Sequence, residues 1–304
     1  MIKSKFLTFV FQKFLKNKDI RIFRNSLVYY FIFRIIRNFL AFDIIIKIYD
    51  FKVFGSIQKN KTSYFLLKKC EFGDYHELNT IKKFSKKNKI LFIDCGCNYG
   101  FYSFYVASLS KENKVISVEA SKKTSSDFLK NLNLNNFLNI DFQNKAISNI
   151  ESSNILFNES NNDWESSQTH SDFKLASTIN IDAVKIDGLT KFYNFNNYKT
   201  IIKLDIEGNE MNAIKGGLKF IEETSPLIII EFSKFIFDKE SNIKYLKNFL
   251  INYEYSIYDT NSQIFYLEDV LNKLMKLDKK YKTIGNYYLI KNFSKNLEDF
   301  LSNE

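Results

Sequence analysis

A short stretch near residue 95 combines residue types that can hold a small ligand in a glycine-rich turn. The apolar run Ile90–Ile93 is followed by Asp94, and glycines stand at positions 96 and 100. Glycine allows a positive φ and a close approach of the backbone to a ligand. A strand, such a turn and a following helix predict the first crossover of a Rossmann-like sheet, where ligands bind outside the carboxyl ends of the strands. Asp94, Gly96 and Gly100 are therefore candidate cofactor-binding residues.

A second acid stands where the next strand should end. Glu119 closes the run Val115–Val118, 25 positions after Asp94. A carboxylate there can accept hydrogen bonds from both hydroxyls of a ribose. The spacing is not GxGxxG, and an acid that opens the loop repels a pyrophosphate and suits a cationic ligand. The pair favours S-adenosylmethionine, a sulfonium, over NAD; the alternative is an ordinary strand-to-helix turn with solvent-facing acids.

Apolar runs alternate with helical segments from residue 89 onward. The predicted strands are Ile90–Ile93, Val115–Val118, Ile140–Phe142, Ile201–Leu204, Leu227–Ile230, Tyr253–Tyr258 and Tyr287–Ile290. The predicted helices are Phe101–Leu109, Lys122–Asn133 and Met211–Glu222. Short apolar strands separated by helices are typical of a parallel sheet covered on both faces. We predict an α/β fold: a Rossmann-like, doubly wound, mostly parallel seven-stranded sheet.

The interval between residues 142 and 201 is predicted to be a β-insertion at the ligand-binding rim. Asn154–Phe157 and Ile179–Ile186 alternate like exposed strands, and a Ser/Asn-rich loop with Trp164 and His170 lies between them. Trp164 is a candidate for stacking on a sugar ring or for filling the insertion, and His170 is a loop histidine, a type that is usually solvent-exposed.

The composition excludes several classes of protein. Of 304 residues, 45% are hydrophobic and 26% charged, which is ordinary for a folded chain. Three cysteines are too few for a disulfide scaffold and predict a reducing, cytoplasmic compartment. Two histidines exclude HExxH and any histidine-rich metal site.

The net charge of +10 is concentrated at the N-terminus. Nine of the 44 basic residues and one of the 34 acidic residues lie within residues 1–40, a net charge of +8, which leaves +2 for the rest. We predict a basic, aromatic-rich helical extension over residues 1–60 and a catalytic domain over residues 61–304, with short strands at Lys47–Phe54 and Tyr64–Lys68. Arg34, Arg37 and Asp43 interrupt the apolar run Asn25–Ile46, so a spanning helix is not expected.

Three uses of this extension are open: helices packed on the catalytic domain, peripheral contact of residues 1–46 with an anionic membrane surface, or nucleic-acid binding. The first is favoured, and nucleic acid is the partner least expected. Localisation is predicted as cytoplasmic, with the inner membrane surface as the alternative.

The glycine loop also resembles a known family. Asp94–Gly100 is similar to the D-x-G-A-N-x-G loop of FkbM-type S-adenosylmethionine-dependent methyltransferases. Further segments resemble later motifs of the family: Val118–Ala120 with Asn131–Asn136, Asn144–Ser148, Val184–Leu189, Ile202–Glu210 and Pro226–Glu231. The resemblance runs from about Tyr75 to Ser233. Cys97 replaces the usual alanine, and Ala120 replaces a proline; with Cys95, the cysteines are expected to be packing residues.

The resemblance implies an O-methyltransferase, with the transferred methyl group near Asp205. It implies a cofactor site made of Glu77, Asp94, Gly96, Asn98, Gly100, Glu119 and Asn144, and a catalytic set made of Asp205, Glu207 and Glu231. Asp205 could act as general base, or Asp205 and Glu231 could bind a divalent cation that acidifies the acceptor; no metal is assigned. Acids in a helical first turn also stabilise the helix dipole, which is the structural alternative for Glu207 and Glu210. His76, beside Glu77, is a further candidate base.

The resemblance implies hydroxyls of sugars or natural products as acceptors, and a sugar of a glycan or lipid-linked saccharide is our first expectation. Two other functions stay open at this stage: an RNA methyltransferase, and a non-catalytic cofactor-binding module of a glycan assembly complex.

Overall fold

The computed structural model describes residues 43–56, 73–160, 175–191, 193–278 and 281–291. They fall into two compact units: the first comprises residues up to Tyr75 together with Ser126–Asn136, and the second comprises His76–Ser125 and the residues from Phe137 onward. The predicted boundary at residue 60 and the predicted strand Tyr64–Lys68 lie outside the described residues. So does the N-terminal segment through residue 42, for which membrane contact stays a prediction.

In the first unit, strands β1 (Asp43–Ile48) and β2 (Phe51–Ser56) form an antiparallel hairpin. The strand predicted at Lys47–Phe54 is therefore confirmed in part: it is a hairpin that turns at residues 49–50 and begins at Asp43, within the apolar run predicted as helical. Three successive isoleucines, Ile44–Ile46, favour a strand because β-branched side chains pack well on a pleated surface. Side-chain amides of the same unit hold the second strand: Asn135 accepts from the Lys52 N–H and Asn131 from the Phe54 N–H, each at 2.6 Å.

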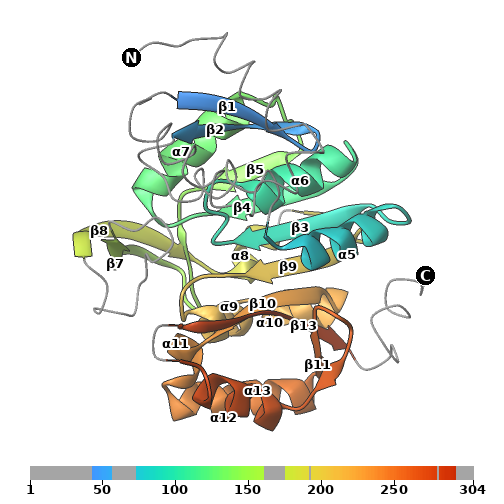
Figure 1. Cartoon of the computed structure of the whole chain (residues 1–304), viewed down its shortest axis with the longest axis vertical. Helices are drawn as coiled ribbons and strands as arrows, with labels where there is room; N and C mark the ends of the chain where they lie inside the picture. The colour runs from blue at the N-terminus through green and yellow to red at the C-terminus, as the bar shows by residue number, and fades with distance from the viewer. Residues whose placement is uncertain (1–42, 57–72, 161–174, 192, 279–280, 292–304) are drawn as a thin grey trace, which may run out of the picture. The chain divides into compact units, whose positions relative to one another are not determined.

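The second unit is built on a mixed sheet in the order β12-β11-β13-β10-β9-β3-β4-β5 (Figure 1). Its strands are β3 (Ile90–Cys95), β4 (Lys114–Val118), β5 (Ile140–Gln143), β9 (Lys199–Leu204), β10 (Leu227–Ser233), β11 (Tyr255–Asp259), β12 (Ile264–Phe265) and β13 (Thr283–Lys291). The five adjacent strands β10, β9, β3, β4 and β5 pair in parallel. The pairs β10–β13, β13–β11 and β11–β12 are antiparallel. The predicted doubly wound α/β sheet is confirmed, but it has eight strands rather than seven, because two-residue β12 is too short to give a sequence pattern.

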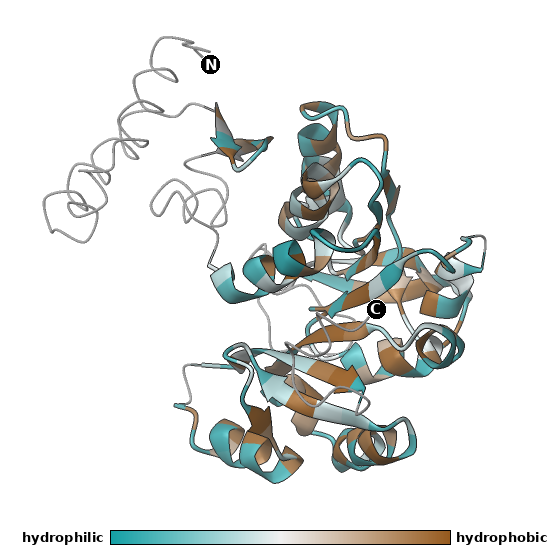
Figure 2. Ribbon diagram, turned by 90° about the vertical axis from the view of Figure 1, so that its right-hand side faces the viewer, coloured by the Kyte–Doolittle hydropathy of each residue, from teal (hydrophilic) through white to brown (hydrophobic). Residues whose placement is uncertain are grey.

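Helices cover both faces of this sheet. They are α5 (Tyr75–Ser85), α6 (Phe101–Leu109), α8 (Ile186–Thr190), α9 (Glu210–Gly216), α10 (Leu218–Thr224), α11 (Lys234–Phe237), α12 (Glu240–Asn252) and α13 (Leu267–Met275). A further helix, α7 (Lys122–Asn133), begins in the second unit and ends in the first. Leu91, Ile93 and Cys95 of β3 join one buried cluster with residues of α8 to α13. Phe92 points the other way and stacks on Tyr102 of α6, with ring centroids 6.3 Å apart. Figure 2 shows the strands as mainly hydrophobic, as expected for a sheet buried on both faces.

The predicted insertion forms a separate three-stranded sheet in the order β6-β8-β7. Its strands are β6 (Ala146–Ile147), β7 (Ser152–Ser160) and β8 (Leu175–Val184). Both predicted strands of the insertion are confirmed, although β7 and β8 are longer than the alternating stretches alone indicate and β8 ends at Val184. Trp164 and His170 lie outside the described residues.

The predicted helix Met211–Glu222 is two helices, α9 and α10, which break at a pair of glycines. A Cβ on Gly216 would lie 2.2 Å from the Ser148 carbonyl oxygen, and one on Gly217 would lie 3.0 Å from the Ile186 Cβ. Backbone at Ser148 therefore leaves no room for a side chain at Gly216, and the Ile186 side chain packs tightly against Gly217. Among the described helices, none has the length and apolar character that crossing a bilayer requires.

Candidate active site

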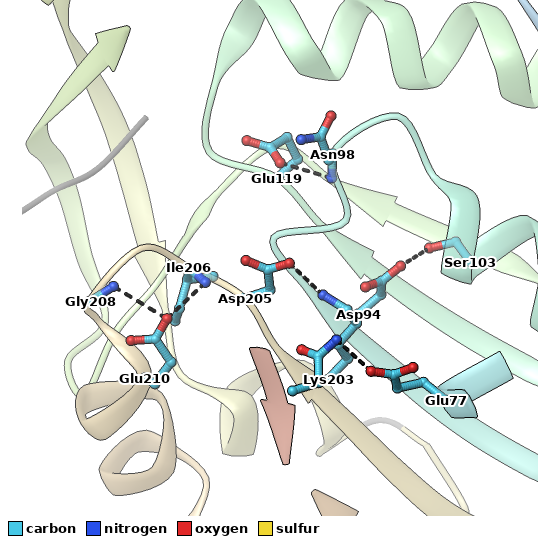
Figure 3. A network of polar contacts seen from close by, with 11 residues as sticks. Glu77, Asp94, Asn98, Ser103, Glu119, Lys203, Asp205, Ile206, Gly208 and Glu210 are labelled. Carbon is cyan, nitrogen blue, oxygen red and sulfur yellow. Dashed lines mark hydrogen bonds and ion pairs between the residues drawn. The ribbon is translucent and has the colours of Figure 1, made fainter. Parts of the chain in front are cut away.

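Acidic side chains from separate strands gather at the carboxyl edge of the parallel sheet (Figure 3). Asp94 lies at the end of β3, Glu119 directly after β4, Asp205 directly after β9, and Glu231 near the end of β10. The register places Asp94 opposite Lys203 and Leu204 opposite Ile230, so the ends of β3, β9 and β10 are neighbours. The structure thus brings together acids that are up to 137 positions apart in the sequence.

The glycine loop packs against the backbone of the neighbouring strand exit. Gly96 has φ +78°, and a Cβ there would lie 1.9 Å from the Asp205 carbonyl oxygen. The N–H groups of Gly96 and Cys97 both donate to the Val118 carbonyl, and the Asp205 N–H donates to the Cys95 carbonyl. Gly100, with φ +88°, leads into α6. The close approach that the first glycine permits is therefore between two protein loops.

Asp94 is in the protein interior, with 1% of its surface exposed. It accepts a hydrogen bond of 2.5 Å from the Ser103 hydroxyl, which is also 2.7 Å from the Ser117 hydroxyl. Burial raises the pKa of the Asp94 carboxyl, against the effect of nearby Lys203. Asp94 thus ties α6 to β3 and β4, a positioning role that its place in the motif did not predict.

Backbone N–H groups hold the predicted ribose acid from two sides. Glu119 is 9% exposed, and its two carboxylate oxygens accept from the N–H of Asn98 at 3.0 Å and of Ser121 at 2.8 Å. Asn98 donates from a left-handed conformation, with φ +50°. Burial raises the pKa of Glu119 to about 7, although both backbone bonds lower it. Asn144 supports this site indirectly: its amide donates to the Glu119 carbonyl at 2.7 Å and to the Ser125 hydroxyl at 2.8 Å.

A buried lysine lies among the acids, and the sequence reasoning missed it. The Lys203 Nζ is 2.7 Å from an Asp205 carboxylate oxygen and 4.8 Å from the centroid of the Tyr102 ring. The lysine side chain is 4% exposed and that of Asp205 38% exposed. A signal was present, because a lysine within the otherwise apolar run Ile201–Leu204 requires a partner when the strand is buried.

The turn after β9 is shaped by another glutamate. Glu207 and Gly208 have φ +52° and +100°, both in the left-handed region. Glu210 Oε1 accepts from the N–H groups of Ile206 at 3.1 Å and Gly208 at 3.2 Å, and only 1% of the residue is exposed. Burial raises the pKa of Glu210 to about 7. Glu210 therefore closes the turn that carries Asp205 and Glu207, while Glu207 itself is partly exposed.

Glu231 lies on β10, the strand between β9 and β13, and so on the side of Asp205 away from Glu119. It is partly exposed, and its register partner on β13 is Asn286, whose amide donates to Glu77 at 2.8 Å. Burial and the Asp205 charge raise the pKa of Glu231 to about 8, whereas Lys203 and a hydrogen bond with Thr283 lower it. Glu77, at the first turn of α5, thus joins the same group through Asn286.

The remaining candidates, two cysteines and a histidine, differ in burial. Cys95 and Cys97 are buried, and burial raises the pKa of both thiols, which fits packing residues. His76 is exposed. Within the described ranges, no three His, Cys, Asp or Glu side chains are placed to hold a metal ion.

A polar cavity of about 680 Å³ lies elsewhere, between β5, the start of β7, the end of β8 and α8. Asp141, Lys145, Glu151, Asp182 and Tyr193 are among its lining residues, and none of the predicted site residues is. We assign the active site to the carboxyl edge of the sheet, because its charged groups converge there.

Residues 94–270 match the model of the methyltransferase FkbM domain, which is more than half of the chain and includes the glycine loop, Asp205 and Glu231. The chain belongs to the FkbM methyltransferase family. The predicted family and the methyltransferase class of enzyme are thereby confirmed. No curated protein matches the sequence.

Solved structures with some likeness to this FkbM methyltransferase include the FkbM methyltransferase of Methylobacillus flagellatus KT, at 18% identity and a TM-score of 0.40. The alignment covers 75% of this chain and 54% of that one, so the present chain spans about half the length of that relative. Others are TYW2 of M. jannaschii in complex with AdoMet (12% identity, TM-score 0.38, 82% and 83% coverage) and a Streptococcus mutans protein in complex with SAH (12%, 0.39, 73% and 99%). Such low similarity carries no argument about activity.

Proposed function

We propose that this FkbM methyltransferase uses S-adenosylmethionine to methylate a hydroxyl oxygen of a sugar. The observation that carries the proposal is the group of carboxylates at the carboxyl edge, with Glu119 held by two backbone N–H groups at one end and Asp205 and Glu231 at the other. One end has the geometry for a ribose, and the other has acids that can receive a proton. The family supports methyl transfer between them.

The residues present fit a sulfonium cofactor. Glu119 is placed to accept from ribose hydroxyls, and the loop from Gly96 to Gly100 lies beside it. Acidic groups outnumber the one lysine, Lys203, among the site residues described here, an arrangement that suits a cation better than a pyrophosphate. S-adenosylmethionine supplies an electrophilic methyl group on a positively charged sulfur. The protein's own task is then to align the acceptor oxygen with that group and to receive its proton.

A neutral hydroxyl acceptor suits the same charges. Carboxyl groups exchange hydrogen bonds with sugar hydroxyls, whereas a phosphate group beside Asp205 would meet like charge. A sugar of a glycan or lipid-linked saccharide therefore remains our preferred acceptor class over RNA.

Titration calorimetry tests the cofactor. The purified protein should bind S-adenosylmethionine and not NAD. Glu119→Ala should weaken binding roughly tenfold or more, because hydrogen bonds to a charged group each contribute about 1.5–3 kcal/mol. Glu268→Ala, an exposed glutamate on α13, is the matched control and should bind like wild type. Equal binding of NAD, or full affinity in Glu119→Ala, would contradict the cofactor assignment.

Methyl transfer from radiolabelled S-adenosylmethionine onto a panel of methyl glycosides tests the acceptor class. Incorporation into a glycoside supports the proposal. Incorporation only into RNA supports an RNA methyltransferase instead, and cofactor binding without transfer to any acceptor supports a non-catalytic module.

A further inference from the structure

We propose that Glu231, rather than Asp205, is the general base that receives the acceptor proton. The inference rests on the proposed function and assigns a step within it. It follows from which carboxylates at the carboxyl edge are already engaged by the protein and which still present a surface to an acceptor.

Two of the buried carboxylates are engaged by the backbone. Both oxygens of Glu119 accept N–H groups, from Asn98 and Ser121, on the side of the site assigned to the ribose. Glu210 uses one oxygen to close the turn at Ile206 and Gly208, and with 1% exposure it offers no surface to an acceptor. Neither residue is placed to take a proton from a hydroxyl at the surface of the site.

Asp205 is engaged by a cation. One carboxylate oxygen lies 2.7 Å from the Lys203 ammonium, which is almost fully buried and held over the Tyr102 ring. The ammonium engages that oxygen in a charge-assisted hydrogen bond. The pair is suited to orienting a substrate.

The surroundings of Glu231 differ from those of Asp205. The charged groups that act on it are Lys203 from β9, Asp205 directly after β9 and Glu210 from α9. With burial and the Asp205 charge acting against Lys203, the pKa of Glu231 is raised to about 8. A base works best when its pKa is near the working pH. Glu231 also keeps a partly exposed surface, through which it can meet an acceptor and later release the proton to water.

In the step itself, the acceptor O–H proton passes to the ionised carboxylate of Glu231 as the acceptor oxygen bonds to the methyl carbon. The carbon–sulfur bond breaks, and its electron pair stays on sulfur, which becomes a neutral thioether. Glu231 ends the step as a neutral carboxylic acid and then loses its proton to solvent. Asp205 keeps its ion pair with Lys203 and takes no proton in this step.

The first test needs neither cofactor nor acceptor. In protein labelled with ¹³C at the glutamate carboxyls, the signal missing from Glu231→Gln identifies Glu231. It should titrate near pH 8 in wild type. Asp205→Asn removes a negative neighbour and should lower this midpoint, while Lys203→Met removes a positive one and should raise it. Glu268→Gln, at an exposed position of α13, should leave the midpoint unchanged. A midpoint below about 6, or no response to Asp205→Asn, would overturn the assignment.

The second test uses turnover on a glycoside that the wild type methylates. Glu231→Gln should lower kcat by roughly 10²–10⁴-fold and remove the alkaline rise of the pH–rate profile. Asp205→Asn should retain that rise and shift it to lower pH. If instead the rise is lost in Asp205→Asn and kept in Glu231→Gln, Asp205 is the base and the assignment is wrong. A wild type that methylates no hydroxyl acceptor would refute the proposed function itself, which is a different result.

Discussion

The two ends of the carboxyl edge differ in what holds their polar groups. At the β4 end, backbone N–H groups fix Glu119, and the Asn144 amide holds the carbonyl beside it. At the β9–β10 end, Lys203, Asp205 and Glu231 are arranged mainly by one another's charges. The end assigned to the cofactor is thus held by main-chain geometry, whereas the end assigned to the reaction depends on side-chain ionisation.

This difference has a consequence for pH. The backbone N–H groups that donate to Glu119 do not titrate, so at that end only the Glu119 carboxyl itself, with a pKa of about 7, responds to pH. At the other end, a change in one group's charge alters the pKa of its neighbours, as the effects of Asp205 and Lys203 on Glu231 indicate. We therefore expect substitutions at the two ends to have separable effects, on cofactor affinity and on the pH profile respectively.

Gly96→Ala should have the largest effect, because it disturbs both ends at once. The new Cβ would lie 1.9 Å from the Asp205 carbonyl oxygen, and the residue has φ +78°. We expect loss of cofactor binding in calorimetry and a marked fall in melting temperature by circular dichroism. Gly285→Ala is the matched control, because Gly285 also has a positive φ, +92°, but nothing lies within 4 Å of its Cβ position. Equal destabilisation by both variants would show that the contact between the loops is unimportant.

Glu210→Gln should have a smaller effect, one that depends on pH. Burial raises the pKa of Glu210 to about 7 from 4.5, so the folded state prefers the protonated form. The resulting stability is fully present below the unfolded pKa and is lost as pH rises through the folded value. A neutral glutamine can still accept the Ile206 and Gly208 N–H groups.

The melting temperature of Glu210→Gln should therefore match wild type near about pH 5 and exceed it by a few degrees near about pH 8.5. The exposed control Glu268→Gln should show no such divergence. A Glu210→Gln variant that is less stable at alkaline pH would mean that the ionised carboxylate is required for the turn.

The sequence predicted much of the main sheet, because its strands are short, apolar and separated by recognisable helices. It also placed Asp94, Glu119, Asp205 and Glu231 near one another, since parallel strands bring their carboxyl ends to one edge. The predicted helix over residues 211–222 failed at Gly216, where the limit is the Ser148 backbone, a contact between distant segments.

The individual roles of the acidic residues were harder to predict from the sequence. Asp94 and Asn144 occur in motif positions, yet their side chains bond to other parts of the protein. The sequence shows Lys203 within a predicted apolar strand, but only the register between β3 and β9 places it beside Asp94. Such pairings depend on which strands are neighbours, and local patterns do not encode that order.

The most direct test of the account compares cofactor affinity at the two ends of the site. S-adenosylmethionine is titrated calorimetrically into Glu119→Gln and Glu231→Gln at neutral pH. We predict that Glu119→Gln loses roughly tenfold or more in affinity, because glutamine has one acceptor oxygen where the carboxylate has two, and its NH2 group would face a backbone N–H. Glu231→Gln should bind within about threefold of wild type, because a carboxyl with a pKa of about 8 is already mostly neutral at that pH. Equal losses in both variants, or full affinity in Glu119→Gln, would contradict the division of the site into a cofactor end and a reaction end.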